Sequence, residues 1–214
     1  MKKKITLFTG LIFYSAIQVF SQVVYVNTVN DSTKQSSAIG LETISTGLQS
    51  FASGYKAEAT GDYTTTFGRQ SKAVSNYSFA GGRYSEATGE YSFAYGHTAK
   101  SAGGFSMAMG HFASANGFCS VALGDVSMAN GLGSYALGFQ VTAEGEYSFA
   151  MGEKLETSAN NAFVLGKGFG ETPLINDRTN SLMVGFNSTV PTLFVGPSQG
   201  GPEGIGKVGI GTSS

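Results

Sequence analysis

Charged and cross-linking residues are both scarce in this chain. Charged residues form 13% of its 214 residues, against about 25% in a typical soluble protein, and 13 basic side chains nearly balance 14 acidic ones. This balance gives no reason to expect a nucleic-acid partner. Cys119 is the only cysteine, which excludes a disulfide within the chain, and four prolines without a Gly-X-Y period exclude collagen. Because 31 residues are glycine and 12% are aromatic, we expect a folded, repetitive architecture.

Long apolar runs are absent after residue 21, and the one before it predicts a signal peptide. Three lysines precede an apolar core over residues 5–20, and Val19 and Ser21 occupy the −3 and −1 positions of a cleavage site before Gln22. An uncleaved membrane anchor is the rival interpretation. Polar residues interrupt the run, however, and it is short for a full span of about 20 residues. We therefore expect a secreted protein that begins at Gln22, with residues 22–35 as a lead-in.

Glycine recurs every 14 residues through the middle of the chain. Eight of these ten anchor glycines have Ser four residues earlier and eight have Ala two residues earlier, and a second glycine usually follows seven residues later. The period is too short for helical repeats and suits one coil of a β-solenoid, with two short strands and two tight turns. Glycine suits such turns because it adopts positive φ without steric cost. The anchor, or turn, glycines are Gly40, Gly54, Gly68, Gly82, Gly96, Gly110, Gly124, Gly138, Gly152 and Gly166.

The strand between each Ser and its anchor glycine alternates small and large residues, which predicts two different faces. A flat 14-residue coil has little interior, so we expect the small Ser and Ala columns inside and a stripe of large apolar residues outside. Such a stripe exceeds the contiguous apolar surface that soluble monomers expose, so identical chains would pack stripe to stripe. In the alternative, the large stripe is the core of a monomer. The interface candidates are Phe79, Phe93, Tyr95, Met107, Met109, Val121, Leu123, Tyr135, Leu137, Phe149 and Met151.

The repeat is similar to that of a known family. Residues 92–96, 106–110 and 120–124 read SFAYG, SMAMG and SVALG, and resemble the S-x-A-x-G repeat of YadA-like heads in trimeric autotransporter adhesins. The resemblance covers about residues 36–170. It implies an all-β fold, a left-handed parallel β-roll, in a homotrimer with the large apolar positions at its centre. It also implies display on the bacterial surface, outside the outer membrane, and binding to host or matrix components.

Residues with chemical potential have structural explanations. His97 and His111 share a column in neighbouring coils, with rings expected about 5 Å apart, but two ligands are too few for a structural metal site. Cys119 lies in an aromatic column without a base to activate it. We therefore expect no catalytic, metal or cofactor-binding residue. A column of alternating charge predicts a cross-strand ladder rather than acid–base pairs. Its members are Glu58, Lys72, Glu86 and Lys100.

The period is lost after residue 170, and residues 171–214 contain all four prolines. We expect an irregular, β-rich neck or linker there that continues into a missing module, with any membrane attachment through an anchor outside this chain. The favoured function is an adhesin head that binds a host or matrix protein, a glycan or a neighbouring cell. The alternative is a structural spacer in a secreted or phage-tail-like trimeric fibre. The variable turn residues that would bind a ligand are Lys56, Arg69, Arg83, Tyr84, His97, His111 and Phe112.

Overall fold

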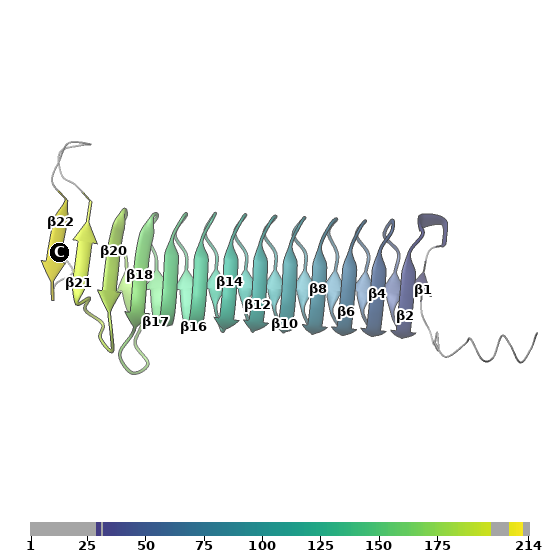
Figure 1. The fold of residues 1–214 in the computed structure, drawn as a ribbon, viewed down its shortest axis with the longest axis horizontal. Coiled ribbons are helices and arrows are strands. Elements are labelled where there is room, and N and C mark those ends of the chain that lie inside the picture. The colour runs from purple at the N-terminus through teal and green to yellow at the C-terminus, as the bar shows by residue number, and fades with distance from the viewer. Residues whose placement is uncertain (1–28, 31, 198–205, 212–214) are drawn as a thin grey trace, which may run out of the picture.

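The protein is a straight stack of β-coils. A computed structural model of the chain describes residues 29–30, 32–197 and 206–211, and the expected signal peptide at 1–21 lies outside these ranges. The described residues form 22 strands, and the strands of successive coils lie side by side along the long axis (Figure 1). The helical element in this part of the chain is a single 3-10 turn, η1 (Ser32–Lys34), and no helix there is long and apolar enough to cross a membrane. The expected all-β parallel solenoid is confirmed.

Each regular coil contains one long and one short strand. The long strands form one wall of the rod and the short strands form the opposite wall, and β1 (Val29–Asn30) begins the wall of short strands. The long strands are β2 (Ser37–Leu41), β4 (Phe51–Tyr55), β6 (Thr65–Arg69), β8 (Phe79–Arg83), β10 (Phe93–His97), β12 (Met107–His111) and β14 (Val121–Asp125). The short strands are β3 (Ile44–Ser45), β5 (Glu58–Ala59), β7 (Lys72–Ala73), β9 (Glu86–Ala87), β11 (Lys100–Ser101), β13 (Ser114–Ala115) and β15 (Met128–Ala129).

Parallel pairing holds identical positions of the repeat in register. Gly96 of β10 is paired with Gly82 on one side and Gly110 on the other, which is the 14-residue spacing of the sequence. In β16 (Tyr135–Ala143) and β17 (Phe149–Thr157) the long and short strands merge into one bent strand, and the register is unchanged. Each residue type is thus stacked on itself, about 4.8 Å from its neighbour.

The interior is thin and made of small side chains. Alanines two residues before the anchor glycine, such as Ala94 and Ala108, are fully buried, as are Ala99 and Ala113 from the opposite wall. The stripe of large apolar residues lies outside, so the structure contradicts the alternative in which that stripe is the core of the monomer. Large apolar residues enter the described interior near the C-terminal end. These are Val141, Leu155, Val164, Leu174, Met183 and Phe194.

The buried serine column is only partly satisfied by hydrogen bonds. The Ser106 hydroxyl donates to the carbonyl oxygen of Gly103 at 2.6 Å and shares a hydrogen bond with the Ser101 hydroxyl, also at 2.6 Å. The equivalent hydroxyl of Ser134 is equally buried but has no hydrogen-bond partner. Serine therefore suits this column because its side chain is small, as well as because its hydroxyl group can form hydrogen bonds.

The corners of the coil differ from the sequence-based expectation. The repeat predicts positive φ at both of its glycines, and the anchor glycine Gly96 has φ of 138°. The second glycine, Gly103, lies outside the left-handed region, and positive φ falls instead on non-glycine residues such as Phe105 at 56°. Gly103 is required for another reason. A Cβ atom there would lie 1.9 Å from the carbonyl oxygen of Gly117 in the next coil, so glycine avoids a clash with the neighbouring backbone at this position.

Regular parallel pairing continues beyond residue 170, where the sequence loses its period. Strand β18 (Ala162–Lys167) pairs with β20 (Ser181–Gly185), and β17 pairs with β19 (Leu174–Asn176), both with an offset of 19 residues. The five additional residues lie in the loop between β18 and β19, so they shift the sequence period without disturbing the pairing. The first part of the expected irregular neck, 171–185, is therefore another coil. After it, β21 (Leu193–Gly196) and β22 (Lys207–Ile210) pair antiparallel.

Candidate functional site

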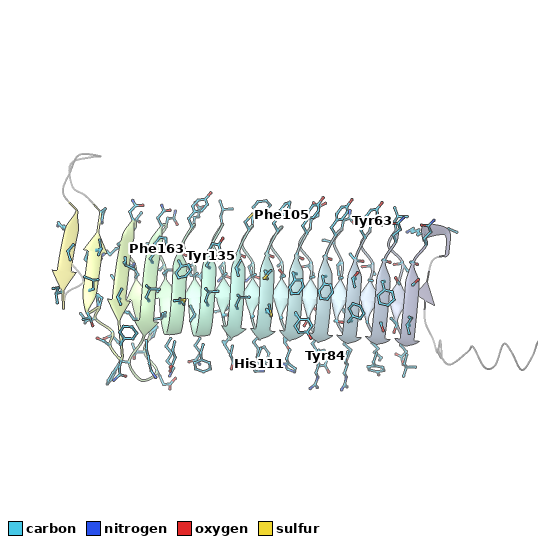
Figure 2. All side chains as sticks on the ribbon, in the orientation of Figure 1. Tyr63, Tyr84, Phe105, His111, Tyr135 and Phe163 are labelled. Carbon is cyan, nitrogen blue, oxygen red and sulfur yellow. The ribbon has the colours of Figure 1, made fainter. Side chains whose placement is uncertain are left out.

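The four sides of the rod have different chemistry, and the wall of long strands carries the apolar stripe. All eleven interface candidates occupy the first or third position of a long strand, where side chains point away from the interior. Tyr135 and Phe163 lie on this wall in Figure 2. The rings of Phe79 and Phe93 stack at 4.9 Å between centroids, and the Tyr95 ring lies over Gly81. The stripe is thus a preformed surface of self-packed rings.

The wall of short strands is polar. Glu58, Lys72, Glu86 and Lys100 are paired in register, and the Lys72 ammonium lies 3.1 Å from the Glu58 carboxylate. Further along, an amide ladder continues this wall. It runs from Asn116 to Asn130 and on to Glu144, each hydrogen bond being 2.7 Å long. Because this wall already pairs its own polar groups and contains few apolar side chains, the apolar stripe has no counterpart here.

One edge of the rod carries a stacked aromatic ladder. Tyr63, Tyr77, Tyr91 and Phe105 occupy one corner column, and the ring centroids of consecutive members are 4.7–5.0 Å apart with nearly parallel planes. Tyr63 and Phe105 mark this edge in Figure 2. Ring faces within the ladder are covered by neighbouring rings, so they are not platforms for a ligand. Burial, together with the negative charge that neighbouring groups carry when ionised, raises the pKa of Tyr77 above its usual value.

Cys119 occupies the next position of the same column and is exposed. The ring that continues the ladder belongs to Phe118 instead, which meets Phe105 edge to face at 5.5 Å. Cys119 therefore replaces an aromatic residue in its column, and the adjacent position supplies the ring.

The opposite edge combines cations with aromatic rings, and Tyr84 and His111 mark it in Figure 2. The Arg83 guanidinium lies 5.0 Å from the Tyr84 ring centroid. The rings of His97 and His111 are 5.1 Å apart, as expected, and His111 Nδ1 is 2.8 Å from an Asp125 carboxylate oxygen. The candidate ligand-binding residues named from the sequence thus lie together on one edge.

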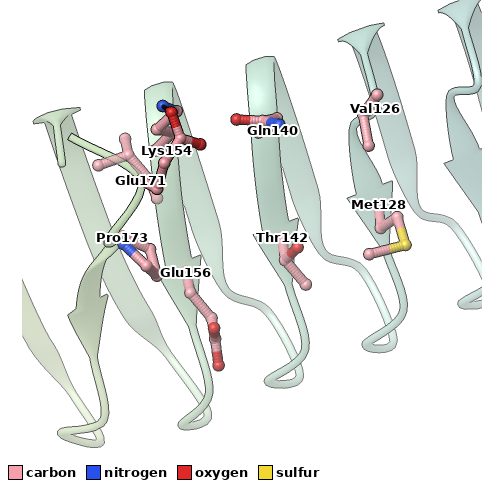
Figure 3. Close-up of a pocket in the computed structure, with 9 residues that line it drawn as sticks. Val126, Met128, Gln140, Thr142, Lys154, Glu156, Glu171 and Pro173 are labelled. Atoms are coloured by element: carbon pink, nitrogen blue, oxygen red, sulfur yellow. Dashed lines mark hydrogen bonds and ion pairs between the residues drawn. The ribbon is translucent and has the colours of Figure 1, made fainter. Parts of the chain in front are cut away.

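A metal site requires a cluster of metal-ligating residues, and a small-molecule site requires a surface hollow of sufficient size. In the described ranges, no three His, Cys, Asp or Glu residues are grouped so that they could hold a metal ion. A shallow groove of about 240 Å³ lies beside the loop between β18 and β19 (Figure 3). There the Lys154 ammonium lies 2.9 Å from the Glu171 carboxylate. The groove is below the usual size of about 300–1,000 Å³ for small-molecule sites, and the ion pair fixes the loop to the rod.

Ten anchor glycines mark one end of each long strand. In the five-residue long strands the anchor glycine is the residue before the last, as Gly96 is in β10, next to the corner. Their φ angles range from 100° at Gly82 to 143° at Gly152. They adjoin the edge that carries the cations and set how closely its coils stack.

Comparison with known proteins agrees with the repeat found in the sequence. A family model described as the YadA head domain repeat (2 copies) matches residues 45–65, 87–113 and 129–152. These segments all lie within the regular part of the solenoid. A search of curated proteins returns no match.

Proposed function

We propose that the coils of this solenoid are YadA-like head repeats and that the chain is the head of a trimeric adhesin displayed on a bacterial surface, which the match to the YadA head domain repeat supports. Its function in this proposal is binding rather than catalysis. Residues 1–21 would direct export, residues 36–170 would form the head, and the part after residue 185 would serve as its neck. The observation that carries the proposal is the continuous apolar stripe on the wall of long strands.

The size of the stripe supports assembly. Seven of its residues are between 38% and 49% exposed, namely Phe67, Tyr95, Met107, Met109, Tyr135, Met151 and Phe163. If a large side chain offers about 200 Å², these seven alone leave roughly 600 Å² of apolar surface in contact with water. That equals the largest patch on a typical monomer, and half-buried members such as Phe93 add to it. Three copies that pack these walls around one axis, as the family implies, would cover the stripe.

A charge placed in the stripe tests the assembly. We expect the wild-type head to sediment as a trimer and Phe93→Glu to sediment as a folded monomer, because a carboxylate cannot be buried unpaired at the centre of the interface. Thr88→Glu is the matched control, since it adds the same charge at an exposed position on the polar wall. Sedimentation velocity gives the mass and far-UV circular dichroism reports the fold. A wild-type head that sediments as a monomer would contradict the trimer.

The adhesive part of the proposal is tested separately. Purified protein is applied to cells and to a panel of matrix proteins and glycans, and we expect saturable binding to at least one of them. If the protein binds no member of the panel, the spacer alternative is favoured. A rod of uniform register would also serve as a spacer. Export is checked by sequencing the N-terminus of the secreted protein, which should begin at Gln22.

A further inference from the structure

One edge of the rod presents a row of lysine, arginine and histidine side chains, here called the cationic edge after its lysine and arginines: Lys56, Arg69, Arg83, His97 and His111. The residues from Arg69 to His111 are consecutive partners in the parallel register, and Lys56, which follows the Arg69 partner Tyr55, lies over the same Tyr55 ring as Arg69. With one coil every 4.8 Å or so, the row is about 19 Å long and one side chain wide. Tyr84 and His111 project from this edge in Figure 2, away from the wall that carries the apolar stripe.

Carboxylates occur only at the two ends of this row. Glu42 is 3.1 Å from the Lys56 ammonium, and Asp125 is paired with His111. Between them, Arg69 and Arg83 are direct cross-strand neighbours, both exposed, and neither forms an ion pair with a described residue. Like charges that face each other across a ladder are destabilising, so an external anion bound between these two guanidinium groups would relieve their repulsion.

Aromatic rings orient the two guanidinium groups. Arg69 lies 5.7 Å from the Tyr55 ring centroid, and Arg83 lies 5.0 Å from that of Tyr84. Stacking of this kind holds a guanidinium flat and limits the entropy lost on binding, while its outer N–H groups remain free to donate. Planar guanidinium groups donate paired hydrogen bonds to the oxygens of sulfate and carboxylate groups.

We infer that the cationic edge binds a linear sulfated polysaccharide laid along the rod, with its sulfate and carboxylate groups on Arg69 and Arg83. The inference rests on the proposed adhesive function and names its ligand class. A pyranose unit is close in length to one coil, so successive sugars meet successive side chains. Nucleic acid fits less well because the arginines cover the ring faces on which bases would stack. A membrane surface would require a broad basic patch or inserted apolar residues rather than one row.

Binding to immobilised heparin tests the inference with two matched double variants of the purified chain. R69Q/R83Q removes two charges from the cationic edge, and K72Q/K100Q removes two charges from the polar wall. We expect R69Q/R83Q to bind roughly tenfold more weakly, and K72Q/K100Q to remain within about twofold of the wild type. Circular dichroism and sedimentation confirm that both variants keep the wild-type fold and mass. Dextran, single-stranded DNA and phosphatidylglycerol vesicles serve as competitors.

The outcomes separate this inference from the function on which it rests. Selective loss in R69Q/R83Q, with competition by soluble heparin alone, supports it. Equal losses in the two variants, no binding of the wild type, or equally strong competition by DNA or vesicles would overturn it. If cells bind the head and R69Q/R83Q equally well, the adhesive function stands and the ligand class is wrong. If heparin is bound selectively and no cell is, the ligand class stands and the adhesive role fails.

Discussion

Gly96→Ala should destabilise the rod far more than a change of one methyl group usually does. Gly96 has φ of 138°, which L residues rarely adopt, and an added Cβ would lie 2.0 Å from the carbonyl oxygen of Gly110 in the next coil. The atom that it meets is backbone, held on both sides by strand pairing, so no side chain can turn away. The two coils would have to separate by more than 1 Å or so at this point to reach an ordinary contact.

The expected cost follows from these two effects. Backbone strain at such a φ contributes about 1–3 kcal/mol, and weakening one or two hydrogen bonds between the coils adds about 1 kcal/mol each. We therefore expect the free energy of unfolding to fall by about 3–5 kcal/mol. Gly170→Ala is the control, because Gly170 has φ of 56° and no atom within 4 Å of an added Cβ. Its cost should be only about 1–2 kcal/mol.

Urea unfolding followed by far-UV circular dichroism measures both variants at one protein concentration. The midpoint for Gly96→Ala should lie well below that for Gly170→Ala. Equal midpoints would refute the reasoning, because they would mean that the coils can move apart at little cost and that the anchor glycines are not required for close stacking.

Three further predictions concern the interior and the aromatic edge. Ser106→Ala should lower the free energy of unfolding by about 1 kcal/mol, because Ser106 donates to Gly103, while Ser134→Ala should leave it unchanged or higher; reversed signs in urea unfolding would contradict this. Phe105→Ala removes two ring contacts and should lower the free energy of unfolding by about 1–3 kcal/mol. Phe186→Ala is the control and should change it little, because Phe186 is 70% exposed. Equal thermal midpoints for the two variants would argue against a stabilising ladder. The raised pKa of Tyr77 contributes stability that is fully present below its unfolded pKa of about 10 and is lost as pH rises through the higher folded value. Phenolate absorbance should show one late-titrating tyrosine that Tyr77→Phe removes.

The arrangement of faces could be predicted from the sequence because one period controls it. Strict alternation of small and large residues over β10 or β12 leaves two possible orientations, and a 14-residue coil is too narrow to hold Phe93 and Tyr95 inside. Burial of Ala94 and exposure of Tyr95 follow from that volume constraint alone. Residues that share a column of the repeat could likewise be grouped from the sequence, because the register places equal positions of the repeat together.

The corner geometry could not be predicted, because it depends on contacts between coils. Residues such as Val126, with φ of 53°, are poor candidates for the left-handed region by local preference. Their backbone N–H groups donate to the coil before, as Val126 does to the His111 carbonyl oxygen at 2.8 Å, and this regular pairing stabilises the conformation. Local preference also gave no sign that the coil pattern resumes at β19 after an insertion.

Because the register is constant, the number of 14-residue repeats sets the length of the rod. Adding or deleting any 14-residue block would leave every column continuous and change the height of the rod by about 4.8 Å, the spacing of one coil. A block of seven would place a short strand against a long one, and an odd number within a strand would turn its small residues outward. Additional residues are accommodated at a corner in the loop between β18 and β19. The length of the rod can therefore change in steps of one coil during evolution, while each of its four sides keeps the same kinds of side chain.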